Sequence, residues 1–346
     1  MVRFTLASFG MVALLALAIA LGGGFAWAAL CYITVFTYFM DKLGALVAPD
    51  RPGSEFPAGD GLAVALGMVH FPLLFGGVAA LTLGPAALPE KLALFFALAL
   101  FLGQVSNSNA HELIHRPNRW MRRLGVAVYG SVLFGFHASA HPRVHHIFAA
   151  TPRDPNSAPL GQGFWRFAQR AWRGALVEGY RAERKLRPTG PTPYSAYAAL
   201  AAASLAGAAM IGGLPAVAVF FALAVYAQLQ LLLSDYVQHY GLQRREITPG
   251  RFEPFGPQHS WNAPHGFSSA LMLNAPRHSD HHSRPMRPYP ALELDCETMP
   301  MLPHSVPVMA VVALIPPVWR RIMDHRARRW ANAPLADPRE SAKVAS

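Results

Sequence analysis

The fold is decided by residues 92–115, which read LALFFALALFLGQVSNSNAHELIH. The run 92–111 contains no Asp, Glu, Lys or Arg, and a helix needs about 20 such residues to cross a bilayer. This run leads directly into His111-Glu-Leu-Ile-His115, whose imidazoles are four residues apart and so lie on one side of a helix. Imidazole is a good ligand for iron, copper, zinc and nickel. The stretch therefore predicts a membrane-spanning helix that carries metal ligands at its end.

Three more uncharged runs, 4–40, 61–89 and 191–234, predict an all-α polytopic membrane protein. Of the 346 residues, 53% are hydrophobic and only 14% are charged, which is outside the range of soluble globular proteins. The first run is long enough for two short spans hinged at the glycines 22–24, and the last for two hinged at 212–215. We therefore expect one membrane-embedded domain, 1–346, with six transmembrane helices at roughly 4–22, 24–40, 61–82, 91–110, 193–212 and 215–235.

Lys and Arg are distributed unevenly along the chain. Of 30 such residues, 13 lie in 112–190 and 13 in 244–346, whereas Lys91 is the only one in the three hairpins expected on the outer side. Cytoplasmic loops of membrane proteins carry an excess of Lys and Arg. The distribution therefore predicts a multi-pass protein of the inner, cytoplasmic membrane with both termini in the cytoplasm. It also places the segments 111–190 and 236–346 there, as a cytoplasmic, histidine-rich cap on the spans.

Three segments outside the spans are expected not to cross the membrane. Residues 124–140 are apolar, but a crossing there would separate the histidines on either side of them, so we expect a re-entrant segment or one lying along the bundle. Residues 242–297 are polar and rich in proline, which predicts loops with short helices. Residues 298–319 are apolar but contain five prolines, which favours an interfacial segment.

The net charge of +11 could instead point to nucleic acid. Loop cations that face anionic lipid account for it better, since no nucleic-acid-binding motif accompanies them. Residues 1–28 resemble a secretory signal, with Arg3, an apolar core and Ala-Trp-Ala at 26–28. Cleavage would leave five spans and disturb the charge pattern, so we interpret this segment as an uncleaved anchor.

Histidines form two further boxes and one outlier beside the apolar runs. The boxes are His141-Pro-Arg-Val-His145-His146 and His278-Ser-Asp-His281-His282, and the outlier is His239 in Asp235-Tyr-Val-Gln-His-Tyr-Gly241. Spacings of three, four or five residues put the imidazoles of each box close enough to share a metal ion. The three boxes and the outlier together hold nine imidazoles, which are too many for one ion and about right for two.

The box 111–115 alone also matches the signature of zinc proteases, with Glu112 as the general base. Such a site needs only one further ligand and gives no reason for the other boxes to exist. A single histidine at the end of a span is usually a hydrogen-bonded structural group. Three histidines fit that role, namely His70, His304 and His325, and for three more the choice between structure and support of a ligand stays open, namely His137, His259 and His265.

Nine neutral imidazoles hold metal ions without neutralising them, so the site stays cationic and can bind O₂. Once it is reduced by two external electrons, such a site can split O₂ to an oxidant strong enough for inert C–H bonds. Substrates without polar groups partition into the bilayer and can reach a site that caps a helix bundle. Carboxylates would then orient the ring N–H groups. The candidates are Glu112, Asp235 and Asp280, with Asp154 as a further one.

Four motifs resemble those of the membrane alkane 1-monooxygenase family, which is related to xylene monooxygenases and to membrane fatty-acid desaturases. They are His-Glu-Leu-Ile-His-Arg at 111–116, Asp-Tyr-Val-Gln-His-Tyr-Gly-Leu at 235–242, His-Ser-Trp-Asn at 259–262 and Arg-His-Ser-Asp-His-His at 277–282. The resemblance implies a non-haem di-iron hydroxylase with six spans and two iron ions, which receives electrons from a separate rubredoxin or ferredoxin. It also implies that the iron ligands are His111, His115, His141, His145, His146, His239, His278, His281 and His282.

The chain departs from that family's pattern at three positions. Ala140 stands where the family usually has Glu, Val144 where it has Gly, and Gln238 where it has Glu. We expect metal binding to persist, because all nine ligand positions are present, and the redox potential or the substrate range to differ. The expected reaction is the O₂-dependent hydroxylation of the terminal methyl group of a medium-chain alkane. The alternatives are an arylmethyl monooxygenase, a membrane lipid desaturase or hydroxylase and, from other classes, an intramembrane zinc protease or a non-catalytic metal-binding protein.

Overall fold

The computed structural model describes residues 1–44 and 57–331, with side chains from residue 59 in the second part. Within this part of the chain the structure is all-α apart from one small hairpin of two strands, which confirms the predicted fold class. The C-terminal segment 332–346, which belongs to the predicted domain, lies outside the described residues.

Five helices of the described chain are long and apolar enough to cross a membrane. Two of them are built from several helical segments that continue one another through a stretch of π-helix. In chain order, the five are α1 (Val2–Leu21), the run α2 (Gly24–Cys31), η1 (Tyr32–Phe36) and α3 (Thr37–Leu43), then α4 (Pro57–Leu83), the run α5 (Leu88–Leu100), η2 (Phe101–Ser106) and α6 (Asn107–Ile114), and finally α11 (Tyr194–His239).

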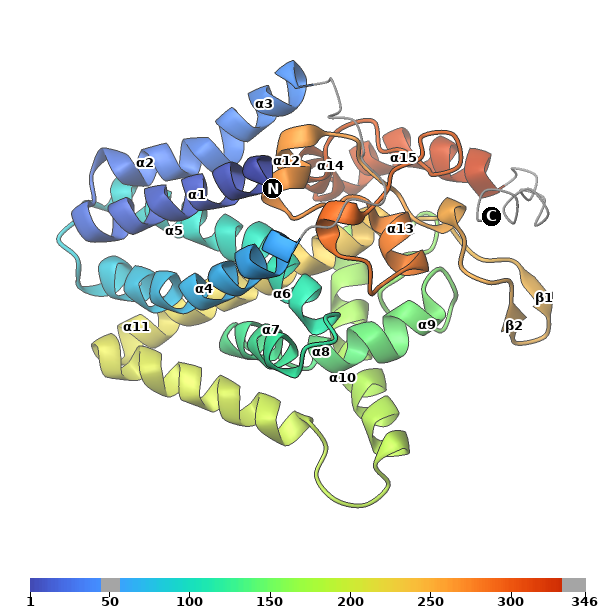
Figure 1. Ribbon diagram of the computed structural model, residues 1–346, viewed down its shortest axis with the longest axis horizontal. Helices are drawn as coiled ribbons and strands as arrows, with labels where there is room; N and C mark the ends of the chain where they lie inside the picture. The colour runs from blue at the N-terminus through green and yellow to red at the C-terminus, as the bar shows by residue number, and fades with distance from the viewer. Residues whose placement is uncertain (45–56, 332–346) are drawn as a thin grey trace.

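The fifth helix, α11, is 46 residues long and is bent where the sequence predicts a hinge. Gly212 and Gly213 leave the helical conformation, and the φ of 63° at Gly213 lies in the left-handed region that glycine adopts without strain. The helix therefore changes direction, and its two arms are visible as a bent ribbon in Figure 1. The structure thus has five candidate spans where six were predicted, because the last two predicted spans are the arms of one bent helix.

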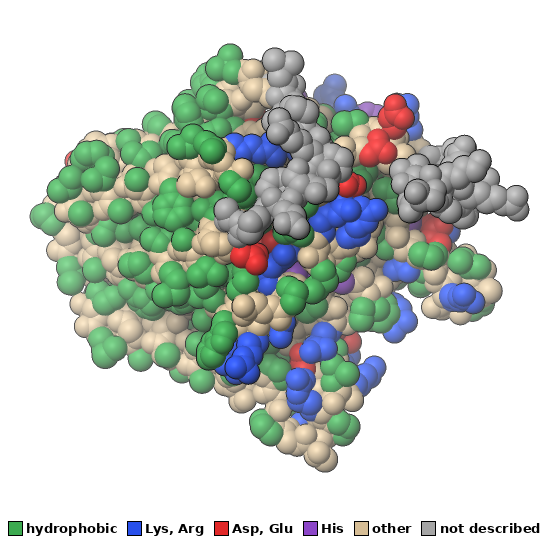
Figure 2. Space-filling view, viewed as in Figure 1, with side chains coloured by type: hydrophobic (Ala, Val, Ile, Leu, Met, Phe, Trp, Pro, Cys, Tyr) green, Lys and Arg blue, Asp and Glu red, His purple; other side chains and the backbone are tan. Residues whose placement is uncertain are grey.

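The long helices gather on one side of the molecule and the short elements on the other (Figure 1). Hydrophobic side chains cover the long-helix side, whereas charged side chains gather on the opposite side (Figure 2). Large apolar side chains on this surface are openly exposed, including Met68, Phe221 and Met210, the last of which is 84% exposed. Such a surface is stable against lipid rather than water, so the chain is an integral membrane protein.

A second layer of helices follows the fourth span. Helix α7 (Arg119–Ser131) has 13 residues, which is too short to cross a bilayer, and it packs against α6 and α4. The close contact with α6 requires Gly125, since a Cβ atom there would lie 2.9 Å from the backbone oxygen of Ala110. The chain then forms α8 (His137–Ala140), η3 (His141–His145) and α9 (His146–Phe148), followed by the amphipathic α10 (Phe164–Leu186).

The C-terminal part consists of loops and short elements, as the sequence predicts for residues 242–297. The strands were not predicted, and the apolar segment 298–319 contains a helix of only eight residues, α14, which is too short to cross. The elements are β1 (Glu246–Thr248), β2 (Arg251–Phe252), η4 (Pro257–His259), α12 (Gly266–Leu271), α13 (His278–Ser283), η5 (Tyr289–Ala291), α14 (Val306–Ala313) and α15 (Pro316–Ala331).

Candidate metal centre

All nine histidines of the three boxes and the outlier meet in one place. Helix α6 and its C-cap supply two of them, η3 and α9 supply three, the last residue of α11 supplies one and α13 supplies three. Their ring nitrogens form two groups, and within each group the atoms lie within 4.8 Å of one another. The first group is His111, His115, His141, His146 and His281, and the second is His145, His239, His278 and His282.

In the first group, the Nε2 atoms converge on a common point. His141 Nε2 lies 2.7 Å from His111 Nε2 and 2.9 Å from His146 Nε2. His281 Nε2 in turn lies 3.1 Å from His146 Nε2. These imidazoles come from three segments of the chain that are far apart in the sequence, so their convergence is a product of the tertiary fold.

In the second group, too, the Nε2 atoms lie close together. His278 Nε2 lies 3.0 Å from His239 Nε2 and 3.1 Å from His282 Nε2. The ring of His145 packs edge-on against the rings of His239 and His282, with centroids 4.7 and 4.8 Å apart. The group therefore joins the last residue of α11 to α13 and to η3.

Both groups fit a metal ion. Each nitrogen of a neutral imidazole carries either one proton or one lone pair. His141 Nε2 faces the Nε2 atoms of both His111 and His146, so it cannot form an ordinary hydrogen bond with each of them at the same time. The Nε2 atoms of His115 and His145 are buried and have no hydrogen-bond partner. Two nitrogens that bind one ion at about 2.1 Å and at right angles lie about 3.0 Å apart, which agrees with the observed contacts.

Burial keeps these imidazoles in the form that binds metal. Removal from water, with the neighbouring imidazoles adding to it, lowers the pKa of His141 and His146 well below its ordinary value. The same causes lower the pKa of His278, His281 and His282. Neutral rings keep a lone pair free for a metal ion at pH 7.

His145 differs from the other eight because its ring is hydrogen-bonded to a carboxylate. Its Nδ1 lies 2.9 Å from Oδ2 of Asp154, which is 0% exposed. Burial acts to lower the pKa of His145, but the charge of Asp154 and the hydrogen bond outweigh it, so the pKa is raised. The carboxylate is held in turn by the hydroxyl of Ser157 and the backbone N–H of Asn156, at 2.7 and 3.0 Å. The pair fixes Nδ1 as the donor and directs Nε2 toward the centre of the second group.

The three carboxylates predicted to orient ligands are buried close to the boxes but have other partners in the structure. Glu112 forms an ion pair with Arg116 at 3.0 Å. Asp235 accepts a hydrogen bond of 2.6 Å from the amide of Asn156. Asp280 forms an ion pair with Arg287 at 3.0 Å and also accepts from the backbone N–H of Glu293. Among the described residues, the carboxylate hydrogen-bonded to one of the nine imidazoles is that of Asp154.

Of the histidines outside the boxes, His70 has a structural role, whereas His259 and His137 lie beside the two groups of imidazoles. His70 is buried between the hydroxyl groups of Ser106 and Ser131, which is a structural role. His259 is hydrogen-bonded through its ring to Glu253 and through its backbone to His239, so it supports a member of the second group. The ring of His137 lies 5.0 Å from that of His141 and faces the cavity described next. In the sequence, the motif His-Ser-Trp-Asn pointed to a role for His259 near the metal centre. For His137, the sequence offered only its distance of four residues from His141.

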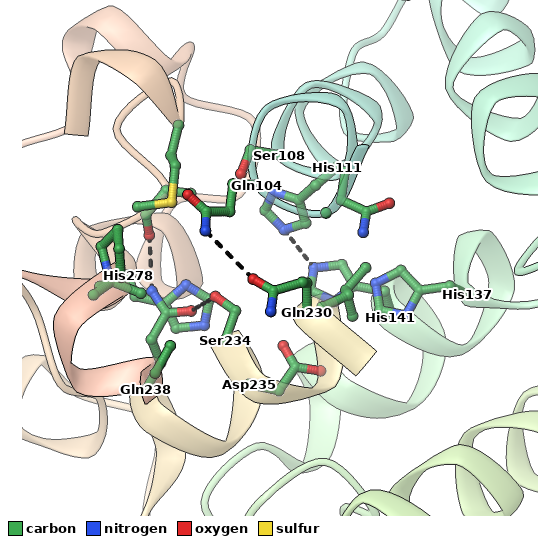
Figure 3. A pocket seen from close by; sticks show the side chains of 18 of the residues that line it. Gln104, Ser108, His111, His137, His141, Gln230, Ser234, Asp235, Gln238 and His278 are labelled. Carbon is green, nitrogen blue, oxygen red and sulfur yellow. Dashed lines mark hydrogen bonds between the residues drawn. The ribbon is translucent and has the colours of Figure 1, made fainter. Parts of the chain in front are cut away.

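A narrow cavity runs along the inner face of the bundle to the imidazoles (Figure 3). Its walls come from η2 and α6, from the second arm of α11, from the segment after α12 and from α14. His111, His141 and His278 face into it, and thus both groups of imidazoles border the same space. Leu231, Met272 and Val306 contribute apolar surface. A molecule in the cavity could therefore reach metal ions held by the two groups.

The sequence of this chain is similar to those of several known proteins. A protein-family model described as "Fatty acid desaturase" matches residues 88–299. Alkane 1-monooxygenase 1 of Pseudomonas aeruginosa is 31% identical over 284 residues, which cover 79% of this chain and 74% of that protein. Alkane 1-monooxygenase 1 of Alcanivorax borkumensis is 34% identical over 262 residues, and the chain spans 62% of its length. The hydroxylase component of xylene/toluene monooxygenase from Pseudomonas putida is 28% identical over 233 residues.

Proposed function

Since the chain belongs to the alkane 1-monooxygenase family, within the wider family of fatty acid desaturases, we propose that it is a di-iron monooxygenase of the membrane. The proposed reaction is the hydroxylation of the terminal methyl group of a medium-chain alkane. One alkane, one O₂, two electrons and two protons give one primary alcohol and one water. The observation that carries the proposal is the cavity, because it lies inside a membrane bundle, is lined in part by apolar side chains and borders both groups of imidazoles.

We propose that each group of imidazoles holds one iron ion. Bound iron would supply the activation of O₂ that breaking an unactivated C–H bond requires. The five imidazoles of the first group and the four of the second add no negative charge, so nearby carboxylates must compensate for the charge of the ions. We assign this role to Asp154 from its contact with His145, and to Glu112, Asp235 and Asp280 from their burial next to the boxes.

The alkane would lie in the cavity, held by apolar contacts such as those of Leu231, Met272 and Val306. Because the cavity lies among helices embedded in the bilayer, an alkane dissolved in the lipid could enter without passing through water. Its terminal methyl group would lie beside His111 and His141, where the cavity meets the first group of imidazoles. Exclusion of water by the surrounding helices would protect the oxidising site from side reactions.

We propose six spans with both termini in the cytoplasm, the two arms of α11 each crossing the membrane. The arrangement rests on the distribution of Lys and Arg and on the length of α11, since its arms 194–211 and 214–239 extend about 27 and about 39 Å at 1.5 Å per residue, against about 30 Å for the hydrocarbon core. Reporter fusions test it. Fusions after residue 180 should give a cytoplasmic signal, and fusions after residues 88 and 214 an external one. An external signal at 180 would refute both the topology and the shared metal centre.

Electrons would come from a separate rubredoxin or ferredoxin. Both are small acidic proteins, and this chain offers cations around the metal centre, including Arg143, Arg244, Arg245 and Arg284. Complementary charge of this kind speeds the encounter of two proteins and falls off with salt. We therefore expect the rate of electron transfer to fall as ionic strength rises.

Two alternatives within the same chemistry stay open. The similarity to the xylene/toluene monooxygenase component favours an arylmethyl substrate, and the match to the desaturase family model favours a lipid. The zinc protease has less support, because a catalytic zinc usually has three protein ligands and an open position, whereas five imidazoles surround the first site.

One experiment separates these reactions. Membranes that contain the protein are supplied with NADH, a reductase and rubredoxin under ¹⁸O₂, together with octane, xylene or a fatty acid. Labelled 1-octanol would support the proposal, and labelled methylbenzyl alcohol alone would favour the arylmethyl branch. Absence of label in every product, with two reducible irons present in the protein, would refute the proposed reaction.

A further inference from the structure

The cavity contains a row of polar side chains on each of two facing helices. Gln104 and Ser108 lie on the fourth span, and Gln230, Ser234 and Gln238 lie on the second arm of α11, each one turn from the next (Figure 3). An alkane offers nothing for these groups to bind. Polar side chains within membrane spans are costly and usually face a functional cavity.

Two of these side chains, Ser234 and Gln238, are hydrogen-bonded to other groups of the protein. The Ser234 hydroxyl donates to Gln238 Oε1 at 2.9 Å, and the Gln238 amide donates to the backbone oxygen of Ala275 at 3.0 Å. The amide pair formed by Gln104 and Gln230 is bonded less completely. Gln104 Nε2 donates to Gln230 Oε1 over 3.4 Å, which is beyond the usual length of an N–H···O bond. Gln104 Oε1 is buried with no hydrogen-bond partner. The amide pair therefore keeps acceptor and donor capacity for a ligand.

The amide pair lies at a defined distance from the metal centre. Gln104 precedes His111 by seven residues in the same continuous helical run, which corresponds to about 10 Å along the axis at 1.5 Å per residue. An extended chain covers about 1.2 Å per bond. A group bound at the amide pair would therefore be about eight or nine bonds from a carbon atom beside the imidazoles.

The cavity is long enough for one extended chain. Its lining extends from Gly103 to His111, about 12 Å along the helix at 1.5 Å per residue. A chain of about eight carbons has this length.

We propose that the amide pair binds the hydroxyl group of a medium-chain primary alcohol whose far methyl group lies at the imidazoles. The hydroxyl donates to Gln104 Oε1 and accepts from the Gln230 amide, which satisfies both groups at once. Oxidation of the far methyl group then gives an α,ω-diol, with the same consumption of O₂, two electrons and two protons. This inference rests on the proposed hydroxylase function and extends it from hydrocarbons to amphiphilic chains of about eight carbons.

The test uses the purified full-length protein with its metals in lipid nanodiscs, with NADH, reductase and rubredoxin. The substrates are 1-octanol and nonane, which have equal numbers of non-hydrogen atoms. The variants Gln104→Met and Gln230→Met keep the side-chain length but remove the hydrogen bonds, and Gln169→Met changes an exposed glutamine on α10 as the control. The quantity measured is the ratio of kcat/KM for 1-octanol to kcat/KM for nonane. The two substrates enter the bilayer to different extents, but this difference is the same for every variant and cancels when the ratios of two variants are compared.

Loss of one neutral hydrogen bond should lower this ratio roughly three- to tenfold in either cavity variant and leave it unchanged in the control. An unchanged ratio in both cavity variants, with nonane still oxidised, would overturn the inference and leave the proposed function intact. Equilibrium binding of tritiated 1-octanol to the same nanodiscs gives an independent readout. If no substrate is oxidised but binding of 1-octanol still weakens in both cavity variants, the proposed function fails while the assignment of the hydroxyl site stands.

Discussion

Replacement of Asp154 by asparagine is expected to weaken metal binding in the second group of imidazoles. The carboxylate is fully buried, and its Oδ2 lies 2.9 Å from His145 Nδ1. Asparagine has nearly the same shape, so packing is preserved, but the negative charge is lost. One of the two carboxylate oxygens also becomes an NH₂ group, which accepts no hydrogen bond; if Oδ2 stays an oxygen and still faces His145 and Ser157, the bond from the backbone N–H of Asn156 to Oδ1 is lost.

The size of the effect follows from these contacts. A hydrogen bond to a charged group contributes about 1.5–3 kcal/mol, against about 0.5–1.5 kcal/mol for a neutral one. The difference for the His145 contact alone is therefore about 1–1.5 kcal/mol, which corresponds to about tenfold in affinity. The lost acceptor on the other oxygen adds to it. We expect the metal affinity of the second group to fall by a factor between about 10 and 100, the range typical for partners of metal-bound histidine.

The assay is titration of the purified protein with a chelator, followed by measurement of iron per chain. Wild-type protein should lose its two irons at high chelator concentration, whereas Asp154→Asn should lose one of them at a concentration at least about tenfold lower. Glu178→Gln, in an exposed ion pair with Arg181, serves as the control and should behave as wild type. If Asp154→Asn retains both irons to the wild-type midpoint, the assigned role of this carboxylate is wrong.

Three further substitutions test other parts of the structure. His281→Ala should abolish activity and lower the metal content, whereas His325→Ala should change neither; loss of metal in the second variant would contradict the assignment of the ligands. Asp280→Asn should lower turnover or iron affinity about tenfold or more, and an enzyme with unchanged turnover and iron content would refute its role in charge compensation. Gly125→Ala should lower the free energy of unfolding by about 1–3 kcal/mol, because its Cβ would meet the neighbouring helix. Gly61→Ala should raise the free energy of unfolding slightly, because its Cβ meets nothing within 4 Å.

The membrane helices could be predicted from the sequence because lipid imposes a simple requirement. A span must be a helix of sufficient length without charge, and the uncharged runs and glycine hinges mark such helices directly. The number of spans was less certain, since a hinge such as Gly212–Gly213 can bend one helix or separate two. The strands β1 and β2 were missed because their five residues are too few for an alternating pattern to emerge.

The convergence of the boxes could be expected from their spacing, but their division into two groups could not. In an α-helix, His141 and His145 would share a face, since they are four residues apart. The structure instead groups His141 with His146, five residues away, and assigns His145 to the other group. These residues lie in η3, a π-helical turn over His141–His145, in which backbone hydrogen bonds join residues five apart instead of four, so the spacing of the ligands differs from that of an α-helix. The amide pair of Gln104 and Gln230 was likewise out of reach, because it joins residues 126 positions apart.

The two groups of imidazoles differ in charge, and this difference has a consequence for electron transfer. The second group has four imidazoles and the carboxylate of Asp154, whereas no carboxylate is hydrogen-bonded to the five imidazoles of the first group within the described chain. Glu112 and Asp280 lie beside the first group, but each is ion-paired with an arginine, Arg116 and Arg287, which reduces the negative charge that they add there. An ion with less negative charge around it is harder to oxidise, so the first site should have the higher reduction potential and accept the first electron. A potentiometric titration followed by Mössbauer spectroscopy should then resolve two reduction steps at different potentials. Asp154→Asn should raise the lower of the two reduction potentials and so narrow the difference between them. A single step that the substitution does not move would mean that the buried carboxylate has no part in separating the two sites.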